Sequence, residues 1–130
     1  MKANELRVGN HYNYHIVDEL DERKEWDEVC IIEAADIEFL EKNPDDKDFK
    51  PIPLTPKALK KCSDIEEING YTFRILPSIG IYVMVLKWSF LERTFSLFVN
   101  DQFVKRQIAS VHEFENLHYA MTGQELEIKL

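Results

Sequence analysis

The C-terminal segment, residues 110–130, constrains the fold more than any other part of this sequence. Ser110 and Glu113 have the spacing of a capping box, in which two side chains bond reciprocally to backbone N–H groups at the start of a helix. Gly123 follows as a left-handed helix stop. At about 100° per residue, one side of the intervening helix collects Val111, Phe114, Leu117, His118 and Met121. The segment therefore predicts an amphipathic helix that packs its apolar side on a β-layer.

Four strand-like runs before this helix predict the β-layer. They cover residues 71–76, 81–88, 94–99 and 103–108. The second run is apolar at both alternating sets of positions, which indicates a central strand covered on both faces. Asn100 and Asp101 tolerate positive φ and suit a two-residue hairpin, and residues 77–80 suit a turn between the first two runs. Residues 124–130 alternate again and predict a closing strand.

The N-terminal part, residues 1–50, is predicted to be β-rich. Residues 11–17 alternate polar and apolar side chains, as a strand with one buried face does. Residues 29–40 are rich in Ile, Val and Phe, which favours one long strand or two short ones, although residues 33–42 could form a helical turn. We expect a bent β-subdomain here, for which an SH3-like barrel is one alternative.

A Pro-rich segment with a short helix, residues 51–70, joins this part to residues 71–130. Thr55 can cap the helix, and Pro56 occupies the first helical position, where its missing N–H costs nothing. A chain of 130 residues has the length of one domain. We therefore predict a single α+β domain, residues 1–130: a β-subdomain, a short helix, and an antiparallel sheet packed on the C-terminal helix.

The formal net charge of −8 limits the partners. It repels a phosphate backbone, so we do not expect nucleic acid as a partner. Residues 18–28 and 41–48 are strongly acidic, either as solvated loops or as a face for a basic partner. No apolar run approaches the roughly 18 residues of a membrane span, and the N-terminus lacks the apolar stretch of a secretory signal. We expect a cytoplasmic protein, no membrane partner, and reduced Cys30 and Cys62.

Motifs for catalysis or metal binding are absent from the sequence. There is no P-loop, no glycine-rich dinucleotide turn and no nucleophile elbow. His11 and His15 would lie about 13 Å apart on one strand face, too far for a single ion. Neither Cys30 nor Cys62 has a histidine at zinc-ligand spacing. Three neighbouring carboxylates have the oxygen ligands that a divalent cation prefers, Glu33, Asp36 and Glu38, but such groupings arise by chance in an acidic chain. We expect no metal and no cofactor.

Candidate binding residues lie on two elements. His112, Asn116 and Tyr119 fall on the side of the C-terminal helix away from its apolar stripe, where His112 could act as a general base oriented by Asn116. The alternative is an exposed or packing face, and since no nucleophile accompanies them we assign no catalytic residue. His118, on the apolar stripe, is expected to be a core imidazole with one satisfied nitrogen. A basic and aromatic surface for base stacking would use Trp88, Arg93, Lys105 and Arg106, with an ordinary sheet rim as the alternative.

Three segments carry a family resemblance: residues 5–10 (ELRVGN), 51–55 (PIPLT) and 111–126 (VHEFENLHYAMTGQEL). In order and spacing they resemble a family of small uncharacterised proteins found in gut-bacterial genomes, in their phages and in mobile elements. The chain departs from the family pattern at Glu113, Glu115 and His118, where glutamines and an aromatic residue are more usual. The resemblance implies a phage or mobile-element accessory protein and carries no chemistry.

These observations together predict a non-enzymatic interaction module whose partner is another protein. Two alternatives stay open. One is a hydrolase or nuclease that uses His112 with nearby carboxylates. The other is an acidic inhibitor of a DNA-binding host protein. The sequence specifies neither the partner nor the oligomeric state.

Overall fold

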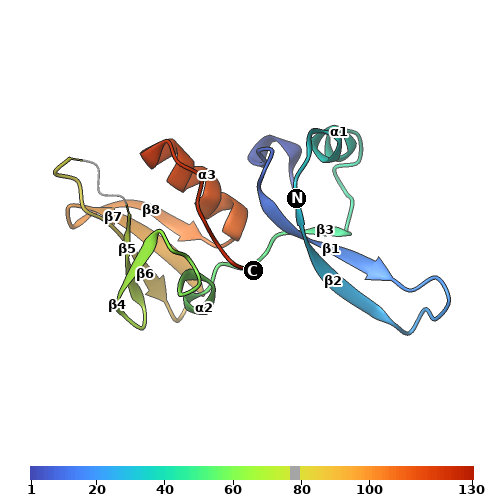
Figure 1. The fold of residues 1–130 in the computed structure, drawn as a ribbon, viewed down its shortest axis with the longest axis horizontal. Helices are drawn as coiled ribbons and strands as arrows, with labels where there is room; N and C mark the ends of the chain where they lie inside the picture. The colour runs from blue at the N-terminus through green and yellow to red at the C-terminus, as the bar shows by residue number, and fades with distance from the viewer. Residues whose placement is uncertain (77–79) are drawn as a thin grey trace. The chain divides into compact units, whose positions relative to one another are not determined.

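The computed structural model describes residues 1–76 and 80–130, which form two compact units, Met1–Ile52 and Pro53–Leu130 (Figure 1). We call them unit 1 and unit 2. The division falls inside the Pro-rich segment. Each unit has its own antiparallel sheet and its own helix, so the chain is α+β, as predicted. Within the described ranges, no helix is both long and apolar enough to span a bilayer.

Unit 1 is a three-stranded sheet with one α-helix. Its elements in chain order are η1 (Ala3–Glu5), β1 (His11–Val17), β2 (Glu25–Ile31), α1 (Ala34–Lys42) and β3 (Phe49–Lys50). The strand order is β2-β1-β3, and β1 pairs with β2 over its whole length. The core consists of Tyr12, Ile32, Leu40 and Phe49, with the rings of Tyr12 and Phe49 stacked at 4.9 Å. Because β2 and β3 each pair only with β1 in this described unit, the sheet is open and not an SH3-like barrel.

Residues 33–42 take the helical alternative instead of extending the strand. Glu33 and Asp36 form a reciprocal capping box, in which the backbone N–H of Glu33 donates to Asp36 Oδ2 at 2.8 Å. Leu40 turns into the core, with Ile37 packed beside it. The cap and this helical spacing outweigh the β-propensity of the isoleucine and phenylalanine in the segment.

Unit 2 is a five-stranded antiparallel sheet with α3 along one face. Its elements are α2 (Pro56–Leu59), β4 (Ile65–Asn69), β5 (Thr72–Ile75), β6 (Met84–Ser89), β7 (Thr94–Val99), β8 (Gln102–Ile108) and α3 (Val111–Thr122). The strands follow sequence order, β4-β5-β6-β7-β8. The covered face contributes buried side chains to the core: Phe73, Ile75, Met84, Leu86, Phe95 and Leu97.

The cap, the glycine stop and the apolar stripe predicted for the C-terminal helix are confirmed. The reciprocal half of the capping box is not formed, because the Glu113 carboxylate accepts from the Ser110 hydroxyl at 3.0 Å and not from its backbone N–H. Ser110 is the N-cap of α3, and its Oγ accepts the backbone N–H of Glu113. Gly123 ends the helix in the left-handed conformation, at φ 71°. Val111 and Phe114 are completely buried, so the apolar stripe faces the core as expected.

The hairpin between β7 and β8 is also confirmed, since Asn100 and Asp101 both have positive φ, 49° and 65°. Three features differ from the prediction. Residues 65–69 form the edge strand β4, whereas the sequence predicts no strand between the short helix and residue 71. The closing strand predicted for residues 124–130 is reduced to one isolated bridge, between Ile128 and Cys62. Strand β6 is central, but its second face is not covered, because Lys87 is exposed. Most of the turn predicted at residues 77–80 lies outside the described residues.

Candidate functional site

The three candidate residues of α3 have different surroundings. His112, Asn116 and Tyr119 do share one side of the helix, but only Tyr119 is exposed, at 44%. The side chain of His112 is 4% exposed and Asn116 is half-buried. A general base must reach a substrate, and His112 is almost completely buried. We therefore keep these residues as α3 surface and packing positions and assign no catalytic residue.

His118 lies in the core of unit 2 and is completely buried. Its Nδ1 is 3.0 Å from the carbonyl oxygen of Gln124, and its Nε2 is 3.0 Å from that of Leu76. Each ring nitrogen therefore lies within hydrogen-bonding distance of a carbonyl oxygen. A neutral imidazole has one N–H to donate to them, which agrees with the expectation of one satisfied nitrogen. This geometry is structural, because both partners are backbone carbonyls.

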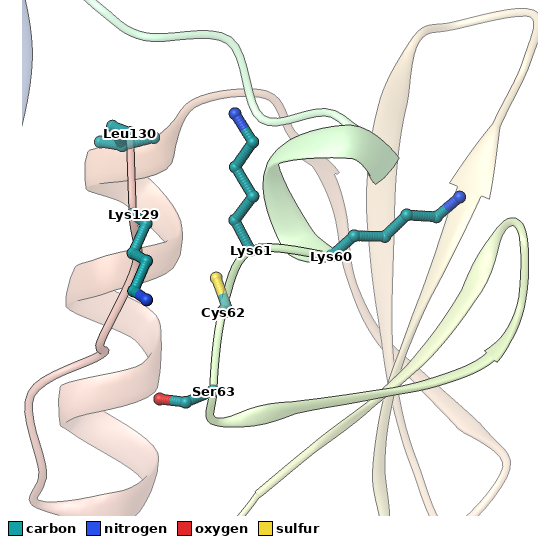
Figure 2. A pocket seen from close by; sticks show the side chains of 6 residues that line it. All are labelled: Lys60, Lys61, Cys62, Ser63, Lys129 and Leu130. Carbon is teal, nitrogen blue, oxygen red and sulfur yellow. The ribbon is translucent and has the colours of Figure 1, made fainter.

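A cavity of about 570 Å³ opens beside α2 (Figure 2). Its lining consists of Lys60, Lys61, Cys62, Ser63, Lys129 and Leu130. Figure 2 shows Lys60 extending away from Lys61 and Lys129, and its Nζ lies 3.6 Å from Glu67. Burial, together with the negative charges of Asp64 and Glu115, raises the pKa of the Cys62 thiol to about 12. The thiol is therefore protonated at neutral pH and is not a nucleophile.

Unit 1 holds the whole net charge of the chain. It contains fifteen acidic and seven basic residues, whereas unit 2 contains nine of each. Part of this charge lies on the β1–β2 hairpin, whose connecting loop is residues 18–24. The acidic stretch of residues 18–28 is thus not a loop throughout, because its second half belongs to β2. Unit 1 therefore has a strongly negative formal charge, whereas the formal charges of unit 2 cancel.

An exposed ionic cluster lies on one face of the hairpin. Nδ1 of His15 is 2.8 Å from Oδ1 of Asp27, and Nε2 of His15 is 3.4 Å from Glu25. Lys50 lies 3.5 Å from the same Asp27 oxygen. The hydrogen bond with Asp27 raises the pKa of His15, and the same bond lowers the pKa of Asp27. Among the described residues, no group of His, Cys, Asp or Glu side chains has the geometry to hold a metal ion.

The hairpin also exposes apolar side chains among its carboxylates. Leu20, at the tip, is 98% exposed, and Trp26 on β2 is 43% exposed. Val29 and Ile31 of the same strand are also exposed. Trp26 lies on the opposite face of β2 from Val29 and Ile31, because successive strand residues alternate, so the exposed apolar side chains are spread over the hairpin.

The basic and aromatic residues of unit 2 gather differently from the prediction. Trp88 pairs with the buried Phe95 and packs on its ring at 4.8 Å, so it belongs to the covered face. Lys105 is opposite the buried Leu97, and Arg93 lies in the turn between β6 and β7. Of the four predicted residues, Arg106 alone lies over an aromatic ring of the other face, that of Phe103.

That uncovered face carries a second set of residues, which we call the basic–aromatic face: Arg74, Lys87, Phe98, Phe103 and Arg106. Directly paired residues of antiparallel strands point to the same side. Arg74 pairs with Val85, Val85 with Phe98, and Phe98 with Phe103. The alternation of residues along each strand indicates which side chains share a face. It did not predict this face, because the sequence predicts that β6 is covered on both faces.

Comparisons with known proteins identify no relative of the chain: no family model, no curated protein and no solved structure matches it. The proposal for its function therefore rests on the geometry described above.

Proposed function

We propose that the chain is a non-enzymatic interaction protein, of the phage or mobile-element accessory type, which acts in the cytoplasm. In this proposal unit 1 binds a protein partner that presents a basic surface. The observation that carries it is the segregation of charge, with fifteen acidic and seven basic residues in unit 1 against nine of each in unit 2. A surface with one dominant sign of charge steers a partner of the opposite sign and excludes others.

The hairpin supports a specific contact and not only long-range attraction. Charged rims mainly set the association rate, while buried apolar anchors supply most of the affinity. Leu20 and Trp26 are exposed and lie among carboxylates, so a partner could bury them within an acidic rim. DNA-binding host proteins are one class with the required basic surface, and an acidic accessory protein would compete with DNA for it.

The test is affinity purification of the full chain from its native host, with two matched charge-reversal variants. Glu19→Lys/Glu22→Lys changes exposed carboxylates of the hairpin loop, and Glu66→Lys/Glu92→Lys changes exposed carboxylates of unit 2 by the same charge. We expect a partner that the wild type and the unit 2 variant capture and the hairpin variant loses. Binding should weaken steeply as salt is added, because exposed charges are screened. Added duplex DNA should displace a partner of the DNA-binding class.

Two results would contradict the proposal. One is a partner captured equally by both variants and at all salt concentrations. The other is catalytic turnover, in which the chain consumes a phosphodiester or peptide substrate and His112→Ala abolishes the reaction. The second result would support the alternative of a hydrolase or nuclease.

A further inference from the structure

The basic–aromatic face of unit 2 contains two aromatic rings, each with a cation over it. Nζ of Lys87 lies 4.6 Å from the centroid of the Phe98 ring. The guanidinium carbon of Arg106 lies 5.1 Å from the centroid of the Phe103 ring. The two rings meet edge to face, with centroids 5.9 Å apart. Three neighbouring strands, β6, β7 and β8, thus present a row in which two adjacent rings have one cation at each end.

This row is accessible to a ligand. Phe103 is 49% exposed, and Lys87 and Arg106 are exposed. Phe103 lies on the edge strand β8, and a phenylalanine that is half exposed there contributes little to the core. It presents π-surface to whatever approaches the sheet.

The cations of the face are not neutralised by the protein. Arg74, Lys87 and Arg106 form no ion pair with any carboxylate of the described residues, although Lys60 and Lys50 elsewhere do. Glu66 is the residue opposite Arg74 on β4, yet the two make no salt bridge. Three unpaired cations on one face leave it positive and able to bind an anion.

A shallow cavity of about 480 Å³ continues the face toward β5. Its floor is aliphatic, with Val83 and Val85, and its polar lining includes Thr72, Arg74 and Lys87. Asp101 also lines the cavity and offers an acceptor to a donor such as a base amino group. Arg74 lines this cavity, so a bound phosphate could accept hydrogen bonds from its guanidinium. Among the described residues, the buried Nε atom of Arg74 has no hydrogen-bonding partner.

We propose that the basic–aromatic face binds single-stranded nucleic acid. Base faces would stack on Phe103 and on the guanidinium plane of Arg106, while Lys87 and Arg74 contact the phosphate backbone. Open sheets with aromatic side chains and unpaired cations are the surfaces that bind unstacked bases, because every base has a π-face and every nucleotide a phosphate.

The negative charge of the whole chain does not oppose this proposal as strongly as its sequence indicates. The expectation of no nucleic acid used the net charge of the whole chain. All of it belongs to unit 1, and unit 2 has equal numbers of acidic and basic residues. The face itself concentrates three of the nine basic residues of unit 2. The local field, and not the sum over the chain, determines what binds there.

Two other occupants fit the face less well. An acidic peptide would pair with the cations but has no planar groups to use the exposed π-surface of Phe103 and the plane of Arg106. A duplex hides its base faces within the stack, so it could use only the cations. Single strands alone match both components of the face.

The test is fluorescence anisotropy of the full-length chain with labelled oligonucleotides about 16 nucleotides long, as single-stranded DNA, single-stranded RNA and duplex. Phe103→Leu removes the π-face and keeps an apolar side chain, whereas Phe103→Tyr keeps the π-face. Lys87→Gln removes one phosphate-contacting cation of the face, and Lys57→Gln removes an exposed cation of α2 as the matched control. All four substitutions are at surface positions, so circular dichroism should show unchanged folding.

We expect saturable binding of a single strand that is tighter than binding of the duplex. Phe103→Leu should weaken binding about tenfold, the size of one lost base stack, and Phe103→Tyr should bind like the wild type. Lys87→Gln should reduce the slope of log affinity against log salt by about 0.7, whereas Lys57→Gln should leave it unchanged. The proposal is overturned if the wild type binds no single strand at low ionic strength, or if Phe103→Leu binds as well as the wild type. It is equally overturned if the duplex binds as tightly, or if polyglutamate displaces the oligonucleotide at equal concentrations of charge.

Discussion

Nε2 of His118 lies 3.0 Å from the backbone carbonyl oxygen of Leu76, so helix α3 is hydrogen-bonded to the residue that follows β5. The second ring nitrogen faces the carbonyl of Gln124, just after the helix ends. Carbonyl oxygens only accept, so whichever ring nitrogen carries the proton donates to one of these two carbonyls. A single buried imidazole thus connects α3 and the segment just after it to the end of β5, which lies far away in the sequence.

Replacing this imidazole should destabilise unit 2. His118→Phe keeps an aromatic ring in the core but leaves the two carbonyls without their side-chain donor. We expect a loss of about 1–3 kcal/mol in the free energy of unfolding, the cost of a buried polar group left unsatisfied. Urea unfolding followed by circular dichroism measures it, with Tyr71→Phe, at an exposed tyrosine of unit 2, as the control. Equal stability of the two variants would show that the His118 hydrogen bonds contribute nothing.

Two phenylalanines of unit 2 provide a matched comparison of burial. Phe114 is completely buried under the sheet, whereas Phe103 is 49% exposed on the other side. Phe114→Ala removes a core ring and should cost about 3–5 kcal/mol. Phe103→Ala should change the free energy of unfolding by no more than about 0.5 kcal/mol. Thermal or urea unfolding of both variants tests the packing of α3, and similar losses for the two would mean that Phe114 is not a core residue.

The elements that were predictable from the sequence are those specified by neighbouring residues. Helix α3 has its cap, its apolar stripe and its glycine stop within a few turns, so no distant contact is needed to recognise it. The same is true of the β7–β8 hairpin, whose two turn residues both tolerate positive φ. Fold class follows from these local signals together with strand patterning.

The elements that were missed depend on distant residues. Strand β4 carries exposed glutamates and forms only because β5 offers it an edge to pair with. In α1, local capping competes with the β-propensity of the same residues, and packing of Leu40 against the unit 1 core decides the outcome. The basic–aromatic face escaped prediction for a similar reason. Lys87 and Phe98 come from different strands, and their meeting depends on register and on which side of β6 the helix covers.

The ionic cluster on the hairpin predicts a pH dependence. The pKa of His15 is raised mainly by its hydrogen bond to Asp27, and the pKa of Asp27 is lowered mainly by the same bond. The raised histidine pKa stabilises unit 1 fully below the unfolded value of about 6.5, and this contribution is lost as the pH rises through the folded value. The lowered aspartate pKa stabilises it above about 3.9, and that contribution is lost as the pH falls through the folded value.

Titration of the His15 ring signals by NMR measures this coupling directly. We expect a midpoint above the ordinary histidine value in the wild type, and a lower midpoint in Asp27→Asn. Lys50 acts in the opposite direction on His15 through its charge, so Lys50→Gln should raise the midpoint or leave it in place, and should not lower it. An unchanged midpoint in Asp27→Asn would mean that the pair does not form in solution.

The two cysteines should differ in reactivity because Cys62 is buried and its thiol has a pKa raised to about 12. Only the thiolate reacts with alkylating and disulfide reagents, and at neutral pH almost none of the Cys62 side chain is in that form. In a Cys30→Ser variant, the remaining thiol should therefore react with a disulfide reagent at neutral pH only after denaturant is added. In a Cys62→Ser variant, the half-buried Cys30 should react in the native protein. Fast modification of native Cys62 would instead mean that the lysines of its cavity lower the thiol pKa and activate it.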